Sequence, residues 1–275
     1  MERYSYQSHN AYLQAQLAKT ERSWFDGRRL SQHMVNIAQL LKCLIGINWP
    51  LERNSLVVCM GARRGLELAA WNLKGYHNIS GVELRPRREH ERIITGDFSR
   101  LQGIFGDGIC DLIYACHSFE HCYDPAATAS EWKRILKPAG VAWLSLPTAL
   151  GDGYLPSESD PVLISRVTEI EKFFDPLRAV WLSTERKPGR GFDMNIVLLD
   201  PQAKTRPFSK GARREMARSI RAGTILCRLV RELSRLARRV TRTRRDYSLD
   251  ICLWIQRLRG PLYRLAGTAR GLFTS

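Results

Sequence analysis

Apolar residues form short continuous runs between residues 55 and 147, and helical patterns separate these runs. Five runs are expected to be strands: 55–60, 81–84, 92–95, 111–116 and 141–146. Runs of this kind are typical of strands buried on both faces of a parallel sheet. Because helical segments lie between them, right-handed crossovers are the economical connection. The pattern predicts an α/β fold with helices on both faces of a mostly parallel sheet.

The flanking segments extend this sheet. Residues 31–46 and 66–74 have helical patterns, and Gly75 can end the second helix. Residues 161–174 are also expected to be helical. Two further strands, 179–183 and 192–199, are joined by a glycine-bearing turn and should form an antiparallel hairpin at the sheet edge. The prediction is a Rossmann-like sheet of seven strands.

The candidate chemistry lies where the predicted strands end. Gly61 and Gly65 form a turn between the first strand and its helix, where backbone N–H groups can face a ligand. This spacing alone is weak evidence, and the dinucleotide fingerprint GxGxxG is not met because Arg63 and Arg64 stand where small residues would be needed. Glu83 ends the second strand, where a carboxylate can accept both hydroxyls of a ribose. The spacing of turn and carboxylate indicates a nucleoside-bearing cofactor.

Residues 55–147 resemble the cofactor-binding core of a class I S-adenosylmethionine-dependent methyltransferase of the type 11 group. The motifs that carry the resemblance are CMGARRG, GVEL, GDF, CDLIYACHSFEHCYDP and RILKPAG. It implies S-adenosyl-L-methionine as the cofactor, bound by Gly61, Ala62, Gly65, Glu83, Leu84, Asp97, Phe98 and Cys116. Within this set, the glycine turn would pass the methionine end, Glu83 would bind the ribose, and Asp97 would meet the adenine amino group. Cys116 and His117 would border the sulfonium.

Two residues depart from the family pattern. Cys59 stands where the family often has an acidic residue, which removes one partner of the cofactor's ammonium group or its water shell. Arg63 stands where the family often has glycine, and its side chain could clash with the cofactor or point outward and meet an acidic substrate. A non-catalytic methyltransferase-like binding protein is therefore the alternative to an enzyme.

Methyl transfer from a sulfonium needs mainly proximity and orientation, because the cofactor carries the activated carbon. A hydroxyl or amine acceptor would also benefit from a base. His117 is the candidate catalytic residue because it follows the fourth strand and can titrate near neutral pH. The other reading is a loop histidine held by hydrogen bonds.

Residues 117–121, HSFEH, also match the inverted zinc-protease signature HxxEH. That chemistry requires both histidines on one helical face and a further ligand. Here the segment follows a buried strand directly, and the next helix starts only at Asp124 and Pro125. The histidines are therefore expected on a loop, and no metal site is predicted.

The cysteines, the N-terminal segment and the lengths of the apolar runs indicate the cellular compartment of the protein. The chain has seven cysteines and no CxxC pair, which indicates buried thiols in a reducing compartment. The N-terminal segment lacks the apolar core of a signal peptide, and no apolar run approaches the roughly 20 residues of a membrane span. We expect a cytoplasmic protein.

The net charge of +16 is unevenly distributed. Residues 202–275 hold 19 lysines and arginines against 4 acidic residues, whereas the first 201 residues hold 24 against 23. The predicted organisation is an N-terminal helical cap at 1–50, a methyltransferase domain at 51–200 and a basic helical tail at 201–275. Such a tail calls for an anionic partner.

From Thr224 the tail fits an amphipathic helix with leucines on one face and arginines on the other. It suits an anionic membrane surface, a helix docked on the domain, or less well a nucleic acid. A tail at a membrane makes a lipid-linked or envelope glycan acceptor attractive beside other small molecules.

Overall fold

The computed structural model describes residues 2–22, 28–86, 91–148, 160–187, 191–203, 208 and 211–220. Its main sheet has seven strands in the order β4-β3-β2-β5-β6-β9-β8. They are β2 (Val57–Met60), β3 (Ile79–Glu83), β4 (Ile93–Thr95), β5 (Cys110–Cys116), β6 (Leu136–Thr148), β8 (Arg178–Lys187) and β9 (Gly191–Leu199). The first five are parallel, while β9 pairs antiparallel with both β6 and β8. The predicted α/β fold with seven strands and an antiparallel edge hairpin is confirmed.

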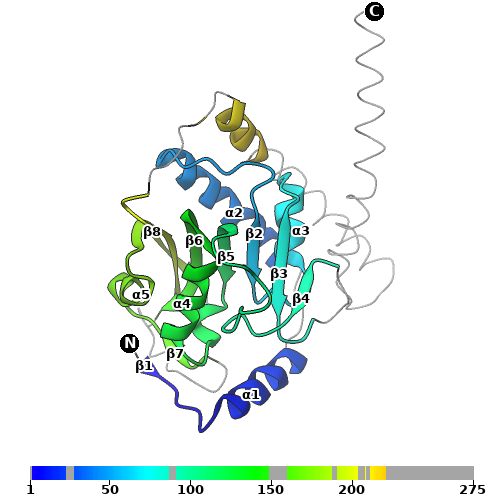
Figure 1. Cartoon of the computed structure of the whole chain (residues 1–275), viewed down its shortest axis with the longest axis vertical. Helices are drawn as coiled ribbons and strands as arrows, with labels where there is room; N and C mark the ends of the chain where they lie inside the picture. Colours follow the sequence, from blue (N-terminus) through cyan, green and yellow to red (C-terminus); the bar gives the residue numbers. More distant parts are fainter. Residues whose placement is uncertain are drawn as a thin grey trace, which may run out of the picture.

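The helices cover both faces of this sheet (Figure 1). On one face, α2 (Arg28–Gly46) and α3 (Leu66–Leu73) pack against alternate strand residues that include Tyr114 and Trp143. On the other, α4 (Pro125–Ile135) and α5 (Val167–Phe174) pack against the intervening residues, such as Ile113. Successive side chains of a strand point to opposite faces of the sheet, so a continuous apolar strand contributes residues to the hydrophobic cores on both faces.

Large aromatic side chains fill the core on the α2 side. The rings of Tyr114 and Trp143 stack with centroids 4.5 Å apart, and Trp71 meets Tyr114 edge to face at 5.7 Å. All three side chains are fully buried. Burying each contributes about 2 kcal/mol or more relative to an exposed side chain, so this face anchors the three central strands.

Helix α4 begins as the sequence predicts. The Asp124 carboxylate accepts hydrogen bonds from the backbone N–H groups of Ala126 and Ala127, at 3.0 and 3.1 Å, and Pro125 occupies the first helical position. Proline suits that position because its missing N–H would have no helical partner there. The segment 117–121 therefore lies between β5 and this cap.

Three elements differ from the prediction. Helix α1 (His9–Arg22) lies within the predicted N-terminal helical cap, but its bounds were not predicted. Residues 161–166 are not helical, because β7 (Val162–Leu163) pairs with β1 (Glu2–Arg3) in a separate two-stranded sheet. Strand β6 begins at Leu136, five residues earlier than expected. Long-range pairing overrides local helical pattern in the second case.

The chain beyond Asp200 returns to the body of the domain. Residues 211–220 are helical, and Met216 is buried in the core on the α2 side. Arg53 forms an ion pair with Glu215, and Lys74 Nζ donates to the Ile220 carbonyl at 3.0 Å. The first part of the predicted basic tail is thus docked on the domain. The predicted amphipathic helix from Thr224 lies outside the described residues, and no helix among the described residues is long and apolar enough to cross a membrane.

Candidate functional site

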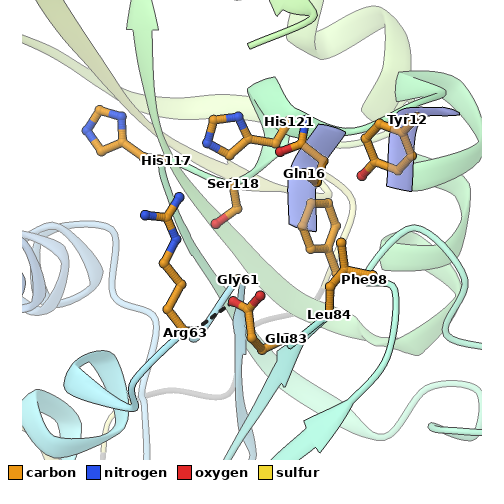
Figure 2. A pocket seen from close by; sticks show the side chains of 10 residues that line it. All are labelled: Tyr12, Gln16, Gly61, Arg63, Glu83, Leu84, Phe98, His117, Ser118 and His121. Atoms are coloured by element: carbon orange, nitrogen blue, oxygen red, sulfur yellow. Dashed lines mark hydrogen bonds between the residues drawn. The ribbon is translucent and has the colours of Figure 1, made fainter. Parts of the chain in front are cut away.

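A pocket lies where β2, β3 and β5 end at their carboxyl edges, with α1 over it (Figure 2). In open α/β sheets this edge is where ligands bind. The pocket is lined by Tyr12, Gln16, Gly61, Arg63, Glu83, Leu84, Phe98, His117, Ser118 and His121.

The glycine turn forms the floor of the pocket. Gly61 has a φ of +71°, in the left-handed region that favours glycine. A Cβ at this position would lie 2.8 Å from Ser118 Oγ, and that hydroxyl donates to the Met60 carbonyl at 2.6 Å. Position 61 is therefore glycine for two reasons, its backbone conformation and the close approach of Ser118.

Glu83 ends β3 beside this turn. Glu83 is 6% exposed, and its carboxylate accepts hydrogen bonds from the backbone N–H of Arg63 at 2.8 Å and of Arg85 at 3.4 Å. Burial raises the pKa of Glu83, and the two backbone N–H groups only partly oppose this. Figure 2 shows Leu84 and the ring of Phe98 on the same side of the pocket. This end of the pocket offers a carboxylate and an aromatic face.

Helix α1 contributes Tyr12 and Gln16, one turn apart, to the pocket. Tyr12 is fully buried, and within the described part of the chain its hydroxyl has no hydrogen-bond partner. Burial raises the pKa of this phenol, with a smaller effect from the charge of Asp97. His9 Nε2, also on α1, lies 3.0 Å from Asp97 Oδ2. The bounds of α1 within the predicted helical cap were not predicted, although the spacing of Tyr12 and Gln16 is a helical signal.

Five residues that the sequence nominates line this pocket together: Gly61, Glu83, Leu84, Phe98 and His117. The other four lie around it. Ala62 is buried behind the turn against Gly81, and Gly65 caps α3 with a φ of +77°. Asp97 binds His9 and the Ser99 N–H, and Cys116 ends β5 with its Sγ 3.6 Å from Asn36 Nδ2.

His117 is held between two carboxylates. Its Nε2 lies 3.1 Å from Asp193 Oδ2 and its Nδ1 lies 3.3 Å from Glu120 Oε1. Burial opposes the charged form, but the hydrogen bonds to Asp193 and Glu120 outweigh it and raise the pKa of His117 well above its ordinary value. With a carboxylate at each nitrogen, both nitrogens act as donors. This arrangement favours the charged form of the ring, which donates protons rather than accepting them.

The HSFEH segment forms no helical zinc motif. Residues Phe119–His121 make a single 3-10 turn, and His121 Nδ1 lies 2.9 Å from Asp160 Oδ1. Glu120 is buried, which raises its pKa, but the interactions with His121 and His117 outweigh burial and lower it. Across the described residues, no group of three or more histidine, cysteine or acidic side chains is arranged to hold a metal ion. The segment is linked to β9, because His117, which follows β5 directly, contacts the carboxylate of Asp193 on β9.

A buried ion pair lies behind the glycine turn. His33 Nε2 on α2 is 3.1 Å from Glu67 Oε1 on α3, and His33 Nδ1 is 3.1 Å from the Tyr114 hydroxyl. Burial lowers the pKa of His33, but the charge of Glu67 outweighs this and raises it to about 10. Burial, with a further contribution from Glu67, raises the pKa of Cys59 well above its ordinary value. The thiol that replaces the family's acid is therefore uncharged.

Comparison with known proteins identifies this core. A family model described as a methyltransferase domain matches residues 58–144, which run from β2 into β6. The segment from β2 into β6 is therefore similar to a methyltransferase domain, and the sheet that contains it has the Rossmann-like fold of such domains. No curated protein sequence matches the chain.

Solved structures share the methyltransferase fold at low sequence identity. The 1,6-didemethyltoxoflavin-N1-methyltransferase of Burkholderia thailandensis, solved with 1,6-didemethyltoxoflavin and S-adenosylhomocysteine, is 16% identical. Its TM-score is 0.53, and the match covers 72% of this chain and 92% of that one. A chain from the Haloferax volcanii complex of the Trm112 methyltransferase activator with a putative methyltransferase is 17% identical, with a TM-score of 0.50. That match covers 71% of this chain and all (100%) of the other. At these identities the likeness shows the fold.

Proposed function

We propose that this protein is an S-adenosylmethionine-dependent methyltransferase that acts on a small-molecule, lipid-linked or glycan acceptor. The observation that carries the proposal is the position of Glu83. A buried carboxylate stands beside a left-handed glycine turn, in the same pocket as the Phe98 ring. This combination suits a nucleoside with a free ribose, because the carboxylate can accept two hydroxyl hydrogens while the ring packs on the base.

The residues of the pocket suit the two ends of the cofactor. Glu83, Leu84 and Phe98 would hold the nucleoside, and the Tyr12 hydroxyl, buried without a partner among the described residues, is available to it. Gly61 and Ser118 would face the amino-acid end, where the absence of a side chain at position 61 lets a ligand approach the backbone. Asp97 lies next to Phe98 and is already bound to His9, so adenine would share that carboxylate with α1.

The cofactor supplies the activated methyl group, and the chain supplies position and charge. In this proposal His117 faces the acceptor end of the pocket as a fixed cation rather than as a base. Its clamp of Asp193 and Glu120 orients the ring, and 43% of the side chain is exposed. An amine or hydroxyl acceptor would then lose its proton to solvent or to a group of its own.

The test of the nucleoside site is a calorimetric comparison of Glu83→Gln with wild type, using S-adenosylhomocysteine. Glutamine keeps an oxygen for the Arg63 N–H but loses the charge, so we expect affinity to fall by about tenfold to a hundredfold. Glu52→Gln, an exposed glutamate outside the pocket, serves as the control and should bind as wild type does. Equal affinity in wild type and Glu83→Gln would remove the observation that carries the proposal.

One feature favours the second candidate, a non-catalytic binding protein. Arg63 stands in the glycine turn and its side chain reaches into the pocket (Figure 2). A protein that binds S-adenosylhomocysteine but consumes no S-adenosylmethionine with extracts of small molecules, lipids or glycans would belong to this class. Release of S-adenosylhomocysteine with any of these fractions would exclude it.

We further propose that the basic C-terminal region brings the domain to the cytoplasmic face of an anionic membrane. The support is the sequence, since 19 of the 43 lysines and arginines lie in residues 202–275 against 4 acidic residues. Flotation of the full chain with liposomes tests this. Binding to vesicles with anionic lipid and not to neutral vesicles is expected, whereas binding to RNA or DNA alone would favour a nucleic acid.

A further inference from the structure

The pocket is chemically different at its two ends. The end near Glu83 has one carboxylate with Leu84 and Phe98, which suits a nucleoside. The other end is formed by Gly61, Arg63, Ser118 and His117, and Figure 2 shows the Arg63 side chain extending away from Glu83 toward His117 and Ser118. A ligand that spans the pocket must therefore place a polar group beside this arginine.

The guanidinium of Arg63 is available to such a ligand. Arg63 is half-buried, and the described part of the chain places no carboxylate oxygen within salt-bridge distance of its guanidinium. Its backbone N–H, not its side chain, binds Glu83. The charge of Arg63 acts on the carboxyl groups of Glu67 and Glu83, but Glu67 pairs with His33 and Glu83 accepts backbone N–H groups. A planar guanidinium in this position matches a carboxylate in a bidentate geometry.

The backbone of Arg63 also departs from what an arginine prefers. Its φ is +30°, in the left-handed region where a residue with a Cβ is disfavoured. A glycine would adopt this conformation without strain. An arginine that is unfavourable for the turn is therefore easier to explain by its side chain in the pocket than by folding.

We infer that Arg63 binds the α-carboxylate of the cofactor's methionine end, which makes it a binding residue specific to this chain. The inference rests on the proposed function. It also gives a function to one of the two departures from the family pattern, because the arginine that replaces glycine would contribute to cofactor binding.

The test is calorimetry on the full chain with two ligands, S-adenosylhomocysteine and its analogue that lacks only the carboxylate. Arg63→Gln should weaken S-adenosylhomocysteine binding about tenfold to a hundredfold and leave binding of the decarboxylated analogue unchanged. Arg63→Lys should recover part of the loss, because it restores the charge without the bidentate geometry. Arg64→Gln, on the same turn, is the matched control and should bind both ligands as wild type does.

Arg63→Gly separates binding from folding. It should raise or preserve the thermal midpoint of the free protein, because it removes the left-handed arginine, and still weaken S-adenosylhomocysteine binding. Unchanged binding in Arg63→Gln would overturn the inference and leave the proposed function intact. Tighter binding in Arg63→Gly would also overturn it, because the arginine would then obstruct the pocket. Failure of wild type to bind either ligand would overturn the proposed function and the inference together.

Discussion

At the residue scale, the Ser118 hydroxyl accounts for glycine at position 61. Alanine there would meet Ser118 Oγ at 2.8 Å and would also have to adopt a φ of +71°. Gly103 is a matched control, since its φ is +78° and nothing lies within 4 Å of its added Cβ. We expect Gly103→Ala to cost about 1 kcal/mol of unfolding free energy and Gly61→Ala to cost roughly 1–3 kcal/mol more, measured by urea unfolding. Equal losses of unfolding free energy in the two variants would contradict this, because they would mean that the Ser118 side chain moves aside without destabilising the protein.

The charge on His117 is a second property at this scale. Because Asp193 and Glu120 raise its pKa well above the ordinary value, its NMR ring signals should still show a charged imidazole at pH values where an ordinary histidine is neutral. Asp193→Asn removes one carboxylate and should lower the pKa. A wild-type midpoint near the ordinary value of about 6.5 would contradict the clamp.

The sequence identifies some of these residues and not others. Gly61 and Glu83 follow strands directly, so their order along the chain places them at the same sheet edge. Asp193 lies 76 positions from His117 and reaches it only because β9 inserts between β6 and β8. The protonation state of His117 therefore depends on tertiary structure that no local pattern contains.

At the element scale, α1 is held over the pocket by a small number of contacts. The His9–Asp97 pair joins it to the end of β4, and Tyr12 packs against the ring of Tyr123 at 5.6 Å. His9→Gln should weaken this attachment and increase amide hydrogen exchange in residues 9–22 while the central strands keep their protection. Unchanged exchange in α1 would show that the aromatic packing alone holds the helix.

The His33–Glu67 pair joins α2 to α3 and makes stability depend on pH. The pKa of His33 is raised to about 10 in the folded protein, from about 6.5 when unfolded, and that of Glu67 is lowered. The contribution of His33 is therefore fully present below pH 6.5 and is lost as pH rises toward 10. Urea unfolding at pH 6 and pH 9 should show a larger loss in wild type than in His33→Gln. Equal losses would contradict the buried pair.

The predicted strands are confirmed because continuous apolar runs leave few alternatives to burial on both faces. The bounds of α1 within the predicted helical cap were not predicted because large apolar residues are few in its sequence, HNAYLQAQLAKTER. Residues 161–166 were mistaken for helix because the pairing of β7 with β1 joins segments about 160 residues apart. Sequence patterns thus predict the strands of the central sheet, and fail for the elements that pair or pack with the N-terminal segment.

At the scale of the whole molecule, the described chain is one α/β domain whose pocket, charges and covering helix meet at one edge of the sheet. The predicted boundary near residue 200 is not marked by a gap in packing, since Met216 lies in the core. Helix α2 likewise packs on the sheet as part of the fold. The excess of basic residues in 202–275 is read from the sequence, and those after residue 220 lie outside the described residues.

The central claim is that the pocket binds the cofactor of a methyltransferase, and calorimetric titration of the full wild-type chain with S-adenosylhomocysteine tests it most directly. We predict saturable binding of one molecule per chain, together with a rise in the thermal midpoint. Absence of both heat and thermal shift at millimolar ligand would contradict the account.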